Sequence, residues 1–270
     1  MNQQTKRWTF AALAAAASLN LFPGAGPAGR AFAALTNTQM VDLLKMVDDR
    51  QRNNGDWRAQ AYLEQKEKDK VDTVYQTEYF RRSSDQKFMI LFTAPKSSAG
   101  QGYLRIDKNL WFYDPSVGKW ERRTERERIG GTNSRRSDFD ESRLAEEYDP
   151  SDEGEEKLGI YTAQKLKLTG KPGQDLAFPI VHIWVDKESK NILKRQEYAL
   201  SGRLLRTSYY TKWTKIFSPS KKGDTWYPGE IRFYDEVEKA NQTLVLIKSV
   251  DPNPLPQNLF TKAWLESKSR

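Results

Sequence analysis

Few side chains in this sequence are suited to catalysis. The 270 residues include one histidine, His182, and no cysteine. Catalytic triads and most zinc sites need a histidine together with partner residues, and thiolate chemistry needs cysteine. His182 lies inside the apolar run 179–186 (PIVHIWVD), so we expect it at a packed or edge position of a strand. We predict no catalytic residue, no metal site and no cofactor.

Other chemical signatures are equally weak. Glu230, Asp235 and Glu236 are examples of the many carboxylates, but no spacing marks the pair across a cleft that glycoside hydrolysis requires. The sequence has no P-loop and no GxGxxG phosphate-binding motif. Residues 203–215 (RLLRTSYYTKWTK) mix basic and aromatic side chains, yet the acidic tract at 138–156 and the predicted export argue against nucleic-acid binding. We therefore predict neither an enzyme nor a nucleic-acid-binding protein.

What remains is a large apolar surface carried by strands. Such a surface either fills an ordinary core or lines a cavity that holds an apolar ligand, and periodicity leaves both alternatives open. If a cavity exists, its lining should come from one parity of the strands, although the sequence does not say which parity faces inward. The candidate lining residues are Phe88, Ile90, Phe92, Leu104, Ile106, Leu110, Phe112, Val181, Ile183, Ile231, Phe233, Leu244 and Leu246.

The stretch from Lys87 to Trp120 best shows the elements that would position these residues. Residues 88–92 are apolar at every position, which is typical of a strand covered on both sides, and Ala94-Pro95 ends it. Residues 103–106 alternate like a half-buried strand. Residues 110–113 form a third strand, followed by a turn at Asp114-Pro115. The stretch is therefore a β-meander.

The same pattern continues through most of the chain. A capping box at 36–39 precedes an amphipathic helix at about 37–50, and residues 260–266 predict a short closing helix. Further strands are expected at 57–68, 71–82, 160–169, 179–186, 192–200, 203–217, 226–237 and 244–250. We predict a mainly β (α+β) fold: a single antiparallel, strongly curved, incomplete β-barrel of about eleven strands, with a few short helices covering one side.

Residues 121–156 interrupt the strands. Arginine and glutamate dominate at first, Gly130-Gly131 breaks the chain, and an acidic tract follows. We predict a loop with one short helix. A long loop inside a compact domain is either a solvated crossover or a functional segment, in this case a flap over a cavity mouth. Phe139 and Leu144 are the lid candidates.

The first 33 residues resemble a secretory signal. Lys6 and Arg7 precede the apolar segment 8–22, and Ala31-Phe32-Ala33 is an A-x-A cleavage site. We expect cleavage before Ala34, with an uncleaved anchor as the alternative, and a single mature domain at 34–270. The formal net charge of +8 is moderate and identifies no partner.

The order of several short motifs resembles the outer-membrane lipoprotein-sorting proteins, which are LolA/LolB-like periplasmic lipoprotein carriers. The motifs extend from about residue 50 to 266, nearly the whole mature chain. They are AP at 94–95, GQGYL at 100–104, NLWFYDP at 109–115, SDF at 137–139 with Leu144, LKLT at 166–169, WVDK at 184–187, LFTK at 259–262 and WL at 264–265.

This resemblance implies an incomplete barrel with an apolar cavity that binds a lipid or an acylated lipoprotein without catalysis. The expected function is that of a periplasmic carrier or chaperone for transfer between membranes, working as a monomer. Relatives often work beside an inner-membrane transporter of the RND or ABC type, which is the expected partner. The alternative is a lipid sensor or adaptor that docks on such a transporter and carries no cargo.

Overall fold

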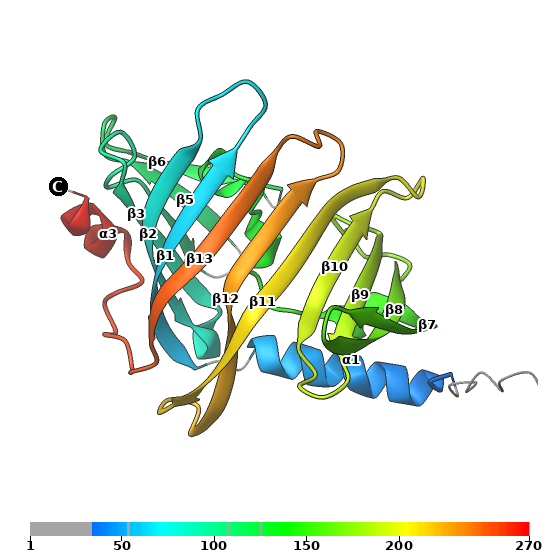
Figure 1. Ribbon diagram of the computed structural model, residues 1–270. Coiled ribbons are helices and arrows are strands. Elements are labelled where there is room, and N and C mark those ends of the chain that lie inside the picture. The colour runs from blue at the N-terminus through cyan, green and yellow to red at the C-terminus, as the bar shows by residue number, and fades with distance from the viewer. Residues whose placement is uncertain (1–33, 53–54, 107–108, 125, 270) are drawn as a thin grey trace, which may run out of the picture. The chain divides into compact units, whose positions relative to one another are not determined.

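One antiparallel sheet of 13 strands dominates the computed structural model shown in Figure 1. The structure describes residues 34–52, 55–106, 109–124 and 126–269, so the predicted leader lies outside the described residues. The strand order is β6-β5-β4-β3-β2-β1-β13-β12-β11-β10-β9-β8-β7. Neighbours in the sequence are neighbours in the sheet, except that β1 and β13 pair in its middle and β6 and β7 are its free edges. The predicted curved, incomplete antiparallel barrel is confirmed.

The bounds of the elements follow the sequence pattern closely. The strands are β1 (Asp56–Lys66), β2 (Thr73–Arg82), β3 (Lys87–Ala94), β4 (Gly102–Ile106), β5 (Asn109–Asp114), β6 (Lys119–Arg123), β7 (Tyr148–Leu158), β8 (Tyr161–Gly170), β9 (Ile180–Asp186), β10 (Ile192–Tyr198), β11 (Leu204–Ser218), β12 (Gly223–Asp235) and β13 (Gln242–Asp251). The α-helices are α1 (Asn37–Arg52), α2 (Leu144–Glu147) and α3 (Lys262–Lys268).

Two of these strands were not predicted. The expected loop over 121–156 is wrong at both ends, where β6 and β7 lie. The composition of β7 (YDPSDEGEEKL) is unusual for a strand because Asp, Pro, Gly and Glu have low β propensity. Its acids instead pair with the neighbouring strands: Glu153 Oε2 lies 3.1 Å from Lys165 Nζ, and Glu156 Oε2 accepts a hydrogen bond of 2.8 Å from Trp184 Nε1. These tertiary contacts outweigh the local propensity.

Helix α1 begins where the capping box predicted. The backbone N–H of Thr36 donates to Gln39 Oε1 at 2.9 Å, and the Gln39 N–H donates to Thr36 Oγ1 at 3.3 Å. Met40, Leu44 and Val47 form its buried face, at helical spacing. They pack against apolar residues of β8 and β9, so α1 covers the β7–β10 side of the sheet (Figure 1). In the ranges described, no helix combines the length and hydropathy needed to span a bilayer.

The sheet is curved, and we call its inner face, on which α1 packs, the concave face and its outer face the convex face. Helix α3 and the segment before it cover the convex face over β2–β4. Phe80, Met89 and Leu104 form a cluster there with Leu265 of α3. Leu265 and Leu104 are both 0% exposed. This packing explains why strand β3 is apolar on both sides: one face meets α3 and the other faces the interior of the half-barrel.

Truncation of the central α3 side chain should destabilise the fold. We expect Leu265→Ala to lower the free energy of unfolding by about 2–5 kcal/mol, because removal of this buried side chain leaves a cavity between α3 and the sheet. Leu200→Ala is the control, since Leu200 is 81% exposed and its loss should change stability by less than about 0.5 kcal/mol. Urea denaturation of residues 34–270 provides the measurement, and equal effects of the two variants would contradict this role of α3.

Candidate functional site

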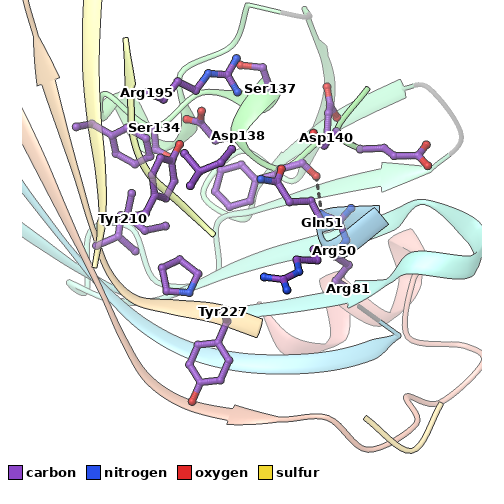
Figure 2. Close-up of a pocket in the computed structure, with 18 of the residues that line it drawn as sticks. Arg50, Gln51, Arg81, Ser134, Ser137, Asp138, Asp140, Arg195, Tyr210 and Tyr227 are labelled. Carbon is purple, nitrogen blue, oxygen red and sulfur yellow. Dashed lines mark hydrogen bonds between the residues drawn. The ribbon is translucent and has the colours of Figure 1, made fainter. Parts of the chain in front are cut away.

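The connection between β6 and β7 covers the interior of the half-barrel and borders its cavity. Because β6 and β7 are opposite edges of the sheet, the chain between them must cross the inner, concave face; we call its residues 126–147 the crossover. A cavity of about 480 Å³ lies between the crossover, α1 and the concave face. Figure 2 shows part of its lining, with Ser134, Ser137, Asp138 and Asp140 from the crossover and Arg50 and Gln51 from α1.

The floor of the cavity is formed by the middle of the sheet. Ala59 and Ala61 of β1 face inward, and their short side chains leave room that larger residues would fill. Ile231 and Phe233 of β12 continue the floor. At the end nearest α1, an aromatic group surrounds the cavity; it consists of Trp57, Trp213, Trp226 and Tyr227. The lining is thus mainly apolar, with polar groups concentrated on the crossover side.

A buried ion-pair network fixes the crossover to β10 and β11. Arg206 of β11 is 2% exposed and Glu197 of β10 is 0% exposed. The guanidinium donates to Glu197 through Nε (2.5 Å) and Nη2 (3.0 Å), and to Asp138 of the crossover through Nη1 (2.8 Å) and Nη2 (2.6 Å). Nη1 also donates to the Asn133 carbonyl at 3.0 Å. Burial alone would lower the pKa of Arg206, but the two carboxylates raise it well above its usual value.

Helix α1 holds the other end of the crossover. Asp48 of α1 is 2% exposed, and its carboxylate accepts hydrogen bonds from Ser142 Oγ (2.6 Å), the Leu144 N–H (2.9 Å) and the Ala145 N–H (2.9 Å). These bonds satisfy backbone donors at the start of α2. Arg81 of β2 donates to the carbonyl oxygen of Phe139 at 2.9 Å. The crossover is therefore attached to the helix and to both halves of the sheet.

The first part of the crossover is packed against the sheet as well. Gly130 has a φ of +58°, and a Cβ there would lie 2.9 Å from the Phe92 ring, so this position requires glycine. Its N–H donates to Tyr103 Oη at 3.1 Å. Thr132, Asn133 and Ser134 are at most 2% exposed. Of the two alternatives for this segment, the solvated crossover is therefore wrong, because its polar groups find partners on the concave face.

The predicted lining residues are divided between the two faces of the sheet. By strand register, most of them lie on the concave face. Ile90, Ile231 and Phe233 line the 480 Å³ cavity, and Val181 and Ile183 pack under α1. The remaining concave members, Phe88, Phe92, Leu110 and Phe112, belong to one cluster with Tyr79 and Phe139. Phe92 and Phe112 also line a second, more open hollow of about 530 Å³ beyond Gly130.

Four predicted lining residues lie on the convex face. Leu104 pairs with Met89, and with Ile106 it packs on the cluster under α3. In β4 the alternate positions, which include Arg105, face inward instead. The side chain of Arg105 forms an ion pair of 2.8 Å with Asp140 of the crossover. Leu244 and Leu246 alternate with Val245 and Ile247, which line the cavity. Both parities of β13 are aliphatic, so the sequence held no signal for its orientation.

The two lid candidates both come from the crossover and both line the cavity. Phe139 packs against Tyr79 and Phe88, with ring centroids 5.5 and 5.7 Å apart. Leu144 is 4% exposed and lies at the start of α2. Their role as a lid stays a prediction.

His182 lies on the convex face of β9, away from the cavity. Its Nδ1 is 2.8 Å from Glu153 Oε2, and its ring lies 4.8 Å from that of Tyr198. Burial lowers the pKa of His182, and Glu153 partly opposes this effect. In the described ranges no group of three or more His, Asp or Glu residues is placed to hold a metal ion.

Sequence reasoning missed the polar lining and the contribution of α1. Val47, Arg50 and Gln51 of α1 line the cavity. The amphipathic pattern of the helix indicates only that its apolar face packs against the protein, and not that the helix borders a cavity. Arg195, Glu197 and Arg206 point inward from strands whose outward positions are also polar, so no alternation marked them. The inward set Trp57, Ala59, Ala61 and Leu63 did alternate in the sequence, and its two small residues were an available sign of free space.

Loss of the central arginine should release the crossover. We expect Arg206→Gln to reduce the free energy of unfolding by about 3–5 kcal/mol, because Asp138 and the fully buried Glu197 would lose their main counter-charge. Backbone amides at 132–138 should also exchange faster with solvent. Arg203→Gln removes an exposed arginine close by and should leave both quantities unchanged. Slow exchange in Arg206→Gln, with stability intact, would show that the network does not hold the crossover.

The single histidine permits a direct test of the electrostatics. In the folded state His182 should titrate below the usual value of about 6.5, as measured by NMR of its ring protons. The folded protein then binds fewer protons than the unfolded chain, so the contribution of His182 to stability is complete above pH ~6.5 and declines as the pH falls below it. Glu153→Gln should lower the pKa of His182 further. A midpoint above 6.5 would instead mean that the Glu153 contact outweighs burial.

Comparison with known proteins places this geometry in a family. The model of a DUF1329-like family, described as "Uncharacterized protein", matches residues 84–267. A search among curated proteins found no match. A solved DUF1329 family protein from Desulfovibrio piger is 17% identical, with a TM-score of 0.73 over 85% of this chain and 98% of its own.

Two further solved structures share the fold. A putative outer membrane lipoprotein-sorting protein domain from Vibrio parahaemolyticus has a TM-score of 0.73 at 16% identity, over 84% of this chain and 97% of its own. A LolA superfamily protein from Nitrosomonas europaea has a TM-score of 0.67 at 21% identity, over 86% and 100%. At these identities the likeness concerns the fold alone. Since the family model covers more than half of the sequence, the chain belongs to the DUF1329-like family and has the LolA-like open-barrel fold.

Proposed function

We propose that this protein is a non-catalytic periplasmic carrier that encloses the acyl chain of a lipid or lipoprotein during transfer between membranes. The observation that carries the proposal is the 480 Å³ cavity, lined mainly by apolar side chains and covered by the crossover and α1. The predicted leader supports the periplasmic location, and the LolA-like fold supports a lipid or lipoprotein as the cargo. An RND- or ABC-type transporter as the donor or acceptor belongs to the same proposal.

The physical mechanism is sequestration from water. Exposure of an acyl chain costs about 0.8 kcal/mol for each CH₂ group, so transfer across an aqueous space requires a dry site. The two alanines in the cavity floor provide the space, and the aromatic group at the α1 end forms an amphipathic border. Release requires a partner that binds the cargo more tightly or favours an open state. The crossover, which is fixed by Arg206 and Asp48, is the element whose displacement would open the cavity.

The proposal is tested by filling the cavity. Ala61→Trp places an indole where Ala61 lines the floor, and we expect it to weaken uptake of a fluorescent fatty-acid probe by at least about tenfold, which is about 1.4 kcal/mol. The matched control is Gln60→Trp, because Gln60 neighbours Ala61 on the same strand but is exposed on the opposite face. It should bind the probe as the wild type does.

Native mass spectrometry of the mature protein from the envelope fraction complements this assay. A bound lipid or acylated peptide that is absent from Ala61→Trp would support the carrier. A ligand-free mass together with no probe uptake by the wild type would exclude it and favour the adaptor that carries no cargo. A folded Ala61→Trp variant that binds the probe normally would place the acyl site elsewhere.

A further inference from the structure

Arg195 is one of several cations that line the cavity, among them Arg50 and Arg81. Arg50 donates a hydrogen bond to Asn191, and Arg81 donates one to the Phe139 carbonyl. Arg195 lies on the concave face of β10, and its side chain is 21% exposed. A guanidinium retains its charge in proteins, and a buried charge is costly unless it is paired and hydrogen-bonded. The partners of Arg195 therefore decide what the cavity can hold.

The carboxylates of Glu197 and Asp138 already accept hydrogen bonds from Arg206. Both oxygens of Glu197 accept hydrogen bonds from Arg206, as do both oxygens of Asp138. Arg195 shares only one of these atoms: its Nε lies 2.9 Å from Glu197 Oε1. Among the described residues, no hydrogen bond joins the two terminal nitrogens of Arg195 to the protein. Four N–H donors of a cation are thus available at the cavity wall.

Neutral donors line the same cavity as this cation. Tyr210 acts electrostatically on Arg195, and Figure 2 draws Ser134 and Ser137 in the same part of the view as Arg195, together with Asp138. Burial raises the pKa of Tyr210 to about 12, so its hydroxyl is protonated at neutral pH. Ser208 is the cross-strand partner of Arg195, and its buried Oγ has no hydrogen-bond partner. Of these groups, Arg195, Ser134, Ser137 and Tyr210 line the cavity and can donate hydrogen bonds to an anion there.

Of the acids that line the cavity, Glu147 is one on which Arg195 acts. Burial raises the pKa of Glu147, and Arg143 and then Arg195 oppose the shift. The low-dielectric setting therefore disfavours the charged form of Glu147. Its carboxylate forms no ion pair within 4.0 Å among the described residues, so it leaves the terminal nitrogens of Arg195 open.

We infer that the cargo is a single-chain amphiphile with an anionic head, in which Arg195 and Tyr210 bind the head and the floor of Ala59 and Ala61 receives the chain. This inference rests on the proposed carrier function and specifies its substrate. A cavity of about 480 Å³ lies within the range of about 300–1,000 Å³ that holds one small ligand. The head can be a carboxylate or a phosphate monoester, since both accept paired hydrogen bonds from a guanidinium.

The experiment separates the head from the chain. A neutral solvatochromic dye reports occupancy of the cavity, and the competitors are hexadecanoic acid, its methyl ester and hexadecyl phosphate, each below its micellar concentration. For the wild type, we expect the acid to displace the dye at a concentration at least about tenfold lower than the ester, because a hydrogen bond to a charged group is worth about 1.5–3 kcal/mol. Displacement by the alkyl phosphate shows whether the site accepts both kinds of head.

Removal of the cation should abolish this preference. We expect Arg195→Gln to bind the acid and the ester alike, with affinity for the ester and the dye unchanged. Arg203→Gln loses the same charge at an exposed position and should keep the full preference. Because Arg195 also lies beside the buried Glu197, Tyr210→Phe is the second variant. It removes only a hydroxyl and should weaken binding of the acid about threefold, with no effect on the ester.

The outcomes distinguish the two proposals. Dye uptake with equal displacement by acid and ester in the wild type would overturn the anionic head and leave the carrier intact. A preference for the acid that survives both Arg195→Gln and Tyr210→Phe would also overturn the assignment of the head to this site. If neither the dye nor any amphiphile binds, the carrier proposal itself fails, and this inference fails with it.

Discussion

The ion pair between Arg206 and Asp138 is the interaction on which the interior of this half-barrel depends. It joins β11 to the crossover, and it is completed by the fully buried Glu197. A segment that must pass over a concave, partly apolar surface carries backbone polar groups that need partners. Arg206, Thr243, Arg81 and Asp48 supply them. The crossover therefore covers the concave face without filling it.

This arrangement leaves the two sides of the sheet with different roles. On the convex face, β2–β4 are closed by α3 through ordinary close packing, and His182 is one more side chain packed on that face. On the concave face, α1 and the crossover are two covers, and the small residues of β1 leave space beneath them. The empty volume results from this geometry, since large side chains line its edges while Ala59 and Ala61 occupy its middle.

Much of the fold could be predicted from local patterns. The capping box placed α1, and alternation with turn residues placed each strand of the 87–114 meander and the strands after residue 160. Strand β7 could not be predicted from its composition. Its extended conformation is stabilised by contacts of its acidic residues with Lys165, His182 and Trp184, which belong to other strands. The orientation of β13 was equally hidden, since aliphatic residues occupy both of its faces.

By itself, the sequence determined that this protein is mainly an antiparallel β structure with strongly apolar strands. Alternation along a strand is a local property, and it is sufficient for this conclusion. Only the tertiary structure decided which parity faces inward and that the loop is a buried cover. It also decided that Arg195 lines the cavity and that its terminal nitrogens make no hydrogen bond to the part of the chain that the structure describes. These features depend on strand register and on contacts between residues distant in the sequence, such as Asp138 with Arg206, for which no local pattern exists.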